Sequence, residues 1–394
     1  MSTPEAAGEL RPASLDEVAR DKLAALERRQ LRRRLVTTDR SGAVDAEQNG
    51  AALISFSCND YLGLTHHPDV IAASVEATQR YGAGAGSSRL VTGNHPLYAE
   101  LERRLAELKG AEDAVVFGSG YLTNLGVIPA LVGRTDLILL DELSHSCLLA
   151  GADLSHARVL EFRHNDVGHA AELLERERPQ HRHCLVLTDG VFSMEGDLAP
   201  LTALAPLATR HDAWLMTDDA HGLGVVGDGR GSSFAHGAPV NVPLQMGTLS
   251  KAVGAYGGYL TASRTVCELV RNRARTFVYS TGLPPGVVAA ASRALDLIGT
   301  DRDLVRRPLK LAREFTAALG LPPATSPIVA LVQGSAENAL AASDALRNAG
   351  FLVAAIRPPT VPPGTSRLRV TFSAEHTSEQ VAALARAVRP FLRA

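Results

Sequence analysis

The sequence predicts an α/β fold with a large, mostly parallel-sheet domain and a smaller α+β carboxyl-terminal domain. Between residues 114 and 221, short apolar runs that end in small or polar residues alternate with stretches of helical length. After about residue 290 the pattern changes to helices, a proline-rich passage and one further strand. Buried strands that alternate with helices are typical of a parallel sheet covered on both faces. At 394 residues the chain is also too long for one small core.

Composition excludes several classes of protein. A hydrophobic content of 45% and a charged content of 21% describe a soluble globular chain. The net charge of -2 provides no basic field for nucleic acid or a membrane surface. The stretch "MSTPEAAGEL" is unlike a signal peptide, and no apolar run approaches the length of a membrane span. Four widely separated cysteines without a C-x-x-C pair predict neither disulfides nor a metal site. We therefore expect a cytoplasmic location.

Two helices are expected before the sheet. Ser14 and Glu17 form a capping-box pattern, and apolar residues follow at helical spacing through "SLDEVARDKLAALERRQLRRRL". The arginine cluster at 32–34 fits a solvated face of this segment. The stretch "LYAELERRLAELKG" predicts an amphipathic helix that ends at Gly110.

The sheet is expected from four apolar runs, "AVVFGSG", "DLILLDE", "RHCLVLTDG" and "AWLMTDDAH". The helices "YLTNLGVIPALVG" and "PLTALAPLATRH" lie between or beside them. Ligands of such sheets bind at the carboxyl ends of the strands, where the polar residues of these runs fall. Later in the chain, "SRLRVTFS" predicts a strand and is followed by a last helix. We expect an amino-terminal helix and arm at 1–55, a large domain at 56–290 and a small domain at 291–394.

Lys251 is the unusual residue of the chain. The sequence has four lysines, and Lys22, Lys109 and Lys310 lie in charged helical patterns that predict solvated faces. Lys251 is alone in "GTLSKAVGAYGG". Burial would lower the pKa of its ammonium and leave a nucleophilic amine, as Schiff-base chemistry requires. A lysine that extends to solvent from a glycine-rich loop explains the stretch equally well.

Three other features point to the same chemistry. Asp218, at a strand end with His221 three residues later, could keep a pyridine nitrogen protonated, although turn formation also explains it. Gly120 opens a strand-turn-helix segment suited to a phosphate, but a turn without a ligand fits as well. His145 at another strand end could stack on a ring, although lone histidines are usually structural. Together with Lys251, these features predict a pyridoxal 5'-phosphate site.

The chain resembles the α-oxoamine synthases, which are fold-type I pyridoxal-phosphate enzymes with the aspartate aminotransferase-like fold. The resemblance covers about residues 15–380 through "SCNDYLGLTHHP", "GAGSSRLVTGNHPLYAELE", "TDGVFSMEGDLAPL", "WLMTDDAHGLGVVGDGRG", "GTLSKAVGAYGGY" and "YSTGLPP". The motifs "LRRRL", "SRLVTGN" and "IRPPTVP" resemble the branch that joins L-alanine to a pimeloyl thioester in biotin biosynthesis.

The resemblance implies roles for individual residues. Catalytic roles fall to Lys251, which bonds to the cofactor, and to His145, Asp218 and His221. The implied cofactor-binding residues are Gly120, Tyr121, His145, Ser193, Asp218, His221, Thr248, Lys251, Ser280 and Thr281. Ser280 and Thr281 match residues that reach the phosphate of a neighbouring subunit, which implies a homodimer. Arg369 matches the arginine that binds the amino-acid carboxylate, with Asn59 nearby, and Arg32 matches one at the acyl-substrate entrance.

The implied activity is a decarboxylative condensation that releases CO2 and a free thiol, with Lys251 as general base. The thiol carrier could be coenzyme A or an acyl carrier protein. A related synthase that uses glycine or serine with a different acyl-CoA is an alternative within the family. A cofactor-binding subunit without activity is an alternative from another class, and the presence of Lys251 disfavours it.

Overall fold

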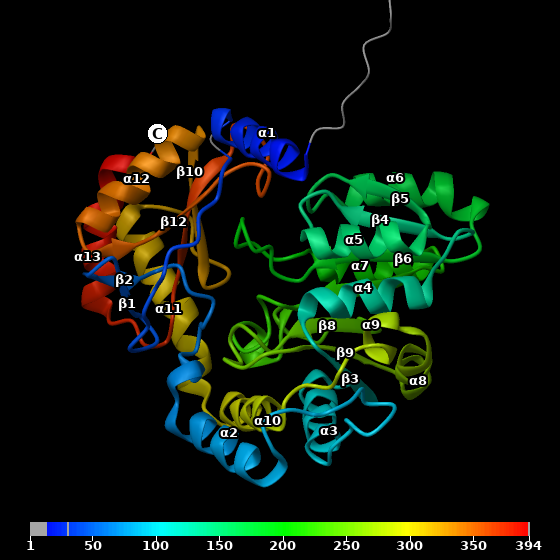
Figure 1. Cartoon of the computed structure of the whole chain (residues 1–394). Coiled ribbons are helices and arrows are strands. Elements are labelled where there is room, and N and C mark those ends of the chain that lie inside the picture. Colours follow the sequence, from blue (N-terminus) through cyan, green and yellow to red (C-terminus); the bar gives the residue numbers. More distant parts are fainter. Residues whose placement is uncertain (1–13, 30, 393–394) are drawn as a thin grey trace, which may run out of the picture.

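A computed structural model describes residues 14–29 and 31–392. The stretch judged unlike a signal peptide, residues 1–10, lies outside the described residues. A seven-stranded sheet of order β3-β9-β8-β7-β6-β4-β5 forms the centre of the larger part of the chain (Figure 1). Its strands are β3 (Asp113–Phe117), β4 (Leu137–Asp141), β5 (Arg158–Phe162), β6 (Cys184–Asp189), β7 (Trp214–Asp218), β8 (Leu244–Thr248) and β9 (Gly258–Ala262). The four apolar runs are thus confirmed as β3, β4, β6 and β7.

The sheet is mostly parallel, as predicted. The exception is β9, which runs antiparallel to β3 and to β8. Strand β4 is buried on both faces because its alternate side chains enter two different cores. Ile138 and Leu140 pack toward one face, where the helices are α4 (Gly120–Leu131), α5 (Ser146–Ser155), α8 (Arg264–Arg273) and α9 (Arg275–Val278). Leu137 and Leu139 pack toward the other, which is covered by α6 (Val167–Glu177) and α7 (Leu201–Arg210).

The remaining helices connect this sheet to the carboxyl-terminal part. Helix α3 (Leu97–Lys109) ends at Gly110 in a left-handed conformation, as predicted. Helices α2 (Pro68–Tyr81) and α10 (Pro285–Thr300) pack against each other beside it, and α11 (Arg302–Leu319) follows (Figure 1). The short 3-10 helices are η1 (Leu64–His66), η2 (Arg178–Gln180), η3 (Gly227–Gly229), η4 (Ser232–Phe234) and η5 (Arg389–Phe391).

A smaller antiparallel sheet of order β10-β13-β12 forms the carboxyl-terminal part. Its strands are β10 (Ile328–Gly334), β12 (Ala354–Ile356) and β13 (Ser366–Thr371), and its helices include α12 (Ala336–Asn348) and α13 (Ser378–Val388). The strand predicted from "SRLRVTFS" and the last helix are confirmed as β13 and α13. Fully buried Phe56 joins this core from the amino-terminal side of the chain.

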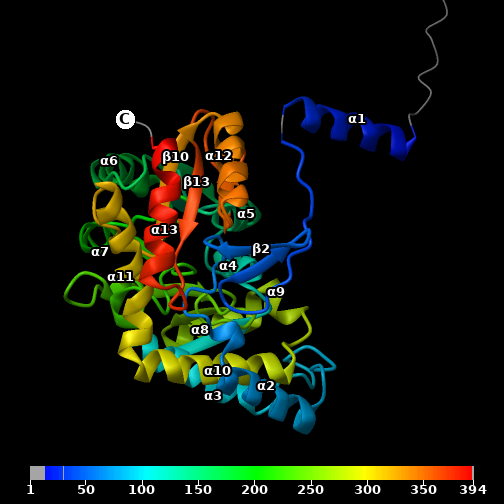
Figure 2. The same cartoon turned by 90° about the vertical axis from the view of Figure 1, so that its left-hand side faces the viewer.

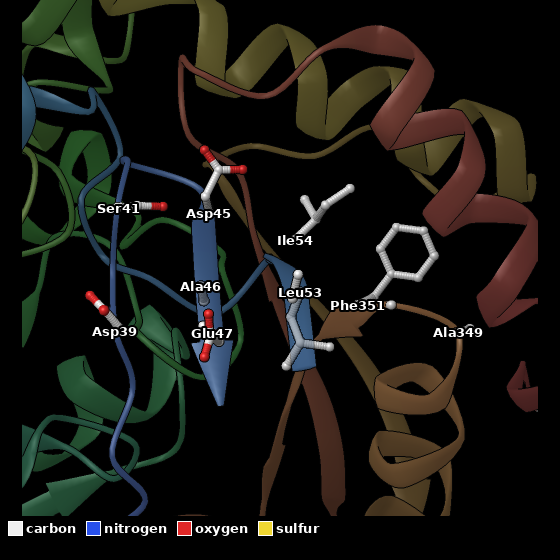
Figure 3. Close-up of a pocket in the computed structure, with 11 residues that line it drawn as sticks. Asp39, Ser41, Asp45, Ala46, Glu47, Leu53, Ile54, Ala349 and Phe351 are labelled. Carbon is white, nitrogen blue, oxygen red and sulfur yellow. The ribbon is translucent and has the colours of Figure 1, made fainter. Parts of the chain in front are cut away.

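A third sheet joins the two ends of the chain. It contains β1 (Asp45–Gln48), β2 (Ala51–Ser55) and β11 (Phe351–Leu352), and β2 is parallel to β11. Figure 3 shows Leu53, Ile54 and Phe351 at a cavity of about 380 Å³ beside the carboxylate-bearing strand β1. The division at residues 55 and 290 stays a prediction, and residues 45–55 pair with the carboxyl-terminal part.

Helix α1 (Leu15–Arg28) begins at the predicted capping box, in which Ser14 and Glu17 exchange hydrogen bonds. The helix buries none of its residues and stands apart from the body of the protein (Figure 2). Within residues 14–29 and 31–392, no helix combines the length and apolarity that crossing a membrane requires. The cytoplasmic location stays a prediction.

The expectation that Lys109 lies on a solvated face is wrong. Its side chain is fully buried at the end of α3, where Nζ lies 2.6 Å from Asp219 Oδ2. Nζ also donates to the carbonyl oxygen of Arg230 at 2.6 Å. The ammonium is tolerated in the interior because a carboxylate and a carbonyl replace its water.

Candidate active site

The carboxyl edge of the central sheet gathers most of the residues that the sequence singled out. Strands β6 and β7 end together, with Asp189 opposite Asp218 in register. The next strand, β8, ends at Thr248, and the chain then turns to present Lys251. Because β9 is antiparallel, its first residue, Gly258, lies at this same edge.

Lys251 is a partly buried amine in this site. Burial lowers the pKa of its ammonium, the carboxylates of Asp218 and Asp189 oppose that effect, and the cation of Arg369 adds to it. The net pKa lies below the usual value, which increases the fraction of neutral amine. Among the described residues, Nζ has no hydrogen-bond or ion-pair partner, so the amine is available to react.

Asp218 is held in place on both carboxylate oxygens. Its Oδ1 accepts a bond from the backbone N–H of Ala220 at 2.9 Å, and Oδ2 accepts one from Asn124 Nδ2 at 2.8 Å. The Cys147 thiol lies 3.9 Å from the same Oδ2. The side chain is buried, so this carboxylate has a fixed orientation in a largely dry site. Such a group is suited to hold a proton on a pyridine nitrogen.

His145 is the N-cap residue of α5, and its backbone N–H donates to Asp189 Oδ2 at 2.8 Å. Its Nδ1 lies 2.8 Å from the Cys147 sulfur. Loss of water around the ring lowers the pKa of His145, and the nearby Lys251 cation lowers it further, while Asp218 opposes them. A neutral ring at the mouth of the site follows from these effects.

His221 and Arg369 are joined through Tyr61. The Tyr61 hydroxyl lies 2.7 Å from His221 Nδ1 and accepts a bond from Arg369 Nη2 at 3.3 Å. Arg369 Nη1 donates to Asn59 Oδ1 at 3.1 Å, and its Nε donates to the Ser193 carbonyl oxygen at 2.5 Å. The arginine side chain is buried, so these bonds fix the direction of its guanidinium.

The protonation of His221 follows from this network. Burial lowers the pKa of His221 well below its usual value, and the cations of Lys251 and Arg369 add to the effect. The ring is therefore neutral. The one proton of the Tyr61 hydroxyl can be donated to His221 Nδ1 at 2.7 Å or to Asn59 Oδ1 at 3.3 Å. The shorter contact favours Nδ1 as the acceptor, in the tautomer that has its ring proton on Nε2. In this tautomer His221 is a hydrogen-bond donor at Nε2.

Helix α4 supplies an anion site at the same edge. Its first N–H groups, at Gly120 and Tyr121, have no partners within the helix. The Ser119 side chain caps the helix by accepting a bond from Leu122 N. A Cβ atom at Gly120 would lie 3.2 Å from Thr248 Cβ, and one at Gly258 would lie 2.6 Å from Gly120 N. The absence of side chains at these glycines allows β8 and β9 to pack directly against the first turn of α4. The two N–H groups without helix partners are suited to bind a phosphate.

Comparison with known proteins identifies the family. The model of the aminotransferase class I and II family matches residues 51–388. A protein of Beijerinckia indica named 8-amino-7-oxononanoate synthase is 58% identical over 381 residues, which cover 97% of this chain and 99% of that protein. A protein of the same name from Granulibacter bethesdensis is 58% identical over 379 residues, with 96% and 98% covered. The chain belongs to the 8-amino-7-oxononanoate synthase family.

Solved structures place this 8-amino-7-oxononanoate synthase family member among the fold-type I pyridoxal-phosphate enzymes. Serine palmitoyltransferase of Sphingomonas wittichii matches with a TM-score of 0.89 and 33% identity, over 96% of this chain and 98% of that one. A serine palmitoyltransferase structure solved with pyridoxal phosphate has a TM-score of 0.89 and 32% identity, over 95% and 96% of the chains. The predicted fold class and the resemblance to α-oxoamine synthases are therefore confirmed.

Four of the predicted residues do not join the cluster around Lys251. Ser280 and Thr281 follow α9, where Thr281 forms a bridge with Ser88. Arg32 is exposed and pairs with Glu27 at 3.2 Å on the amino-terminal segment. The Tyr121 side chain is also exposed, although its backbone lies in the first turn of α4.

The sequence reasoning missed three residues of this site in the 8-amino-7-oxononanoate synthase family member. Tyr61 links His221 to Arg369, while Asn124 and Cys147 contact Asp218. Two of them are polar residues that were quoted within motifs, but no local pattern indicates their distant partners.

The described residues fit pyridoxal phosphate. The unpartnered amine of Lys251, the fixed carboxylate of Asp218 and the Nε2 donor of His221 match its aldehyde, ring nitrogen and phenolic oxygen. The backbone N–H groups of Gly120 and Tyr121 at the start of α4 match its phosphate.

Proposed function

We propose that this chain condenses L-alanine with a pimeloyl thioester to give 8-amino-7-oxononanoate, CO2 and free thiol, as a step of biotin biosynthesis, with pyridoxal 5'-phosphate as cofactor. The observation that carries the proposal is the low-pKa amine of Lys251 beside the fixed carboxylate of Asp218. The names and the 58% identity of near full-length relatives support the choice of reaction.

In this proposal the cofactor is held at several points. When bound, pyridoxal phosphate supplies an aldehyde that bonds to amines and a ring that accepts an electron pair from the substrate α-carbon. Asp218 holds the proton on the ring nitrogen, and Asn124 keeps its carboxylate oriented. His221 donates from Nε2 to the phenolic oxygen, and His145 covers the ring and excludes water. Thr248, Ser193 and the amides of Gly120 and Tyr121 complete the cofactor contacts.

Lys251 has two roles in the proposal. It is the residue that bonds to the cofactor at rest, and its free amine removes the α-proton of the bound amino acid. A general base works best when its pKa lies near the working pH, and burial moves the pKa of Lys251 in that direction. Protonated Lys251 then returns that proton to the product carbon.

Arg369 is proposed to bind the alanine carboxylate. Its guanidinium is directed by Asn59, Tyr61 and the Ser193 carbonyl, so little freedom is lost when a carboxylate binds. Arg32 is proposed to meet the acyl substrate, which would require the amino-terminal segment to approach the site. The carrier of the pimeloyl group is coenzyme A or an acyl carrier protein.

A homodimer is also part of the proposal, because Ser280 and Thr281 match residues that reach the phosphate of the neighbouring subunit in the family. In a dimer they would reach the phosphate bound to the other subunit. Sedimentation equilibrium of the loaded protein should give twice the mass of the 41.6 kDa chain. A monomer with full activity would contradict this part of the proposal.

The reaction is tested by measuring CO2 release from alanine, glycine or serine, each paired with pimeloyl, acetyl, succinyl or palmitoyl-CoA. Alanine with pimeloyl-CoA should give the highest kcat/KM. Lys251→Ala should abolish turnover, while Lys310→Ala, which removes an exposed lysine, should not change it. A clear preference for glycine or serine with another thioester would replace the proposal by the alternative within the family.

A further inference from the structure

A second cavity opens at the edge of the central sheet opposite to Lys251. It has a volume of about 900 Å³ and lies where β7 and β8 begin and β9 ends. Small-molecule sites have volumes of roughly 300–1,000 Å³, so the cavity is large enough for a ligand. None of the residues proposed for the active site lines it.

The walls of this cavity are mainly apolar. They include Trp214 at the start of β7, Phe234, Val240, Leu244, Val266 and Leu269. Trp214 and Leu269 remain 37% and 40% exposed, which is unusual for large apolar side chains that line one concave surface. The cavity therefore offers an extended apolar surface to a hydrocarbon or aromatic group.

Arg230 lines the cavity and, among the described residues, has no carboxylate partner. Its Nε donates to the Leu108 carbonyl oxygen at 2.9 Å, and its guanidinium carbon lies 3.7 Å from the centre of the Phe234 ring. Burial lowers the pKa of Arg230, and the cation of Arg302 lowers it further. An anion bound here would compensate the guanidinium for its lost water and would offset the repulsion from the Arg302 cation.

Three of the other polar groups of the cavity are already engaged. The Lys109 ammonium is paired with Asp219. The Gln245 amide accepts a bond from Ser233 at 2.8 Å and donates to the Lys109 carbonyl oxygen at 3.3 Å. The Glu112 carboxylate accepts the backbone N–H of Arg264 at 3.1 Å. Of the two cations that line the cavity, Lys109 and Arg230, Arg230 is thus the one left to bind an anion.

We propose that this cavity is a second ligand site for a medium-chain carboxylate, with the carboxylate at Arg230 and the hydrocarbon chain along Phe234, Leu244 and Leu269. The planar fork of a guanidinium matches the two oxygens of a carboxylate. A single cation at one end of an apolar surface is complementary to a molecule with one anionic end and an apolar body.

The test uses the loaded, full-length protein and decanoate as probe. Trp214 is the only tryptophan of the chain and lines the cavity, so its fluorescence reports directly on occupancy. Decanoate should produce a saturable change in emission, and calorimetry should give the same Kd. Decanol and decyltrimethylammonium, which lack the anionic group, should bind at least roughly tenfold more weakly.

Variants decide where the probe binds. Arg230→Gln should weaken decanoate binding by about tenfold or more and leave decanol binding unchanged. Leu269→Gln, a change at an exposed position, should weaken both probes without affecting folding, and Arg386→Gln on α13 serves as the matched control. Equal binding of decanoate and decanol, or decanoate binding that is unaffected by Arg230→Gln and Leu269→Gln, would overturn the proposal. A change in Trp214 emission with protein concentration, in the absence of decanoate, would also overturn the proposal. It would show that the cavity is a contact between copies of the chain.

Discussion

The Nζ atom of Lys109 lies 2.6 Å from Asp219 Oδ2, and neither side chain reaches solvent. This ion pair joins the end of α3 to the residue that directly follows Asp218. Asp219 Oδ1 also accepts the Ser232 backbone N–H at 2.9 Å, so its carboxylate connects three segments behind the active site. The pair therefore stabilises the backbone from which Asp218 projects.

Replacing Lys109 should destabilise the protein strongly. Lys109→Met leaves the Asp219 carboxylate buried without a cation, and removal of one partner of a buried pair costs about 3–5 kcal/mol. Urea unfolding should show this loss in the free energy of unfolding. Lys310→Met, at an exposed position, should change it by less than about 0.5 kcal/mol. Equal effects of the two substitutions would show that the buried pair has no special role.

Loss of the Tyr61 hydroxyl should impair use of the amino acid more than binding of the cofactor. In Tyr61→Phe, Arg369 loses one of its orienting bonds and His221 Nδ1 loses its partner. We expect kcat/KM for alanine to fall by about tenfold, as for loss of a bond to a charged group, with cofactor still bound. Steady-state kinetics and the absorbance of the bound cofactor measure the two effects. Tyr256→Phe, at an exposed position, is the control.

A side chain at Gly258 should displace the first turn of α4, where the phosphate is proposed to bind. The Cβ atom of Gly258→Ala would lie 2.6 Å from Gly120 N, so the first turn of α4 would have to move. We expect weaker binding of pyridoxal phosphate, measured by dialysis and absorbance. Gly299→Ala introduces the same methyl group at a helix position where no atom lies within 4 Å, and it should leave affinity unchanged. Unchanged affinity in Gly258→Ala would show that the first turn of α4 does not bind the phosphate.

The stability contributed by His164 should depend on pH. Its Nδ1 lies 3.0 Å from Asp141 Oδ1, and its Nε2 lies 2.9 Å from Asp197 Oδ2. Burial of the ring lowers its pKa, but the bonds to Asp141 and Asp197 outweigh burial and raise the pKa to about 10. The unfolded chain has an ordinary pKa of about 6.5. The stabilisation is therefore complete below about pH 6.5 and is lost as the pH rises through about 10.

The pH dependence is measured as the difference in free energy of unfolding between the wild-type chain and His164→Gln. This difference should be largest near pH 6 and should shrink as the solution becomes more alkaline. A difference that is constant from pH 6 to pH 10 would show that the imidazole is not charged between its two carboxylates.

Local patterns in the sequence predicted local structure well. The capping box at Ser14 and the glycine at 110 set helix ends through contacts within a few residues, so a short window contains the information. The apolar runs predicted strands because burial on both faces leaves no polar alternation. The direction of β9 could not be predicted in this way, since an apolar run looks the same in either orientation.

The candidate site was predictable only in part, for a physical reason. Lys251, Asp218 and His145 stand at strand ends, where the topology of a parallel sheet brings separate segments together. Lys109 was misassigned because the helical pattern around it contains no information about Asp219, which is 110 residues away. The contact of Tyr61 with His221 is likewise made only by the fold, across 160 residues.

The central claim is that the amine of Lys251 bonds to pyridoxal phosphate. It is tested most directly by adding the cofactor, reducing the protein with borohydride and mapping the modified peptide by mass spectrometry. The chain has four lysines, so the assignment is unambiguous. We expect one pyridoxyl group per chain, on Lys251. A colourless protein with no adduct, or an adduct on Lys22, Lys109 or Lys310, would contradict it.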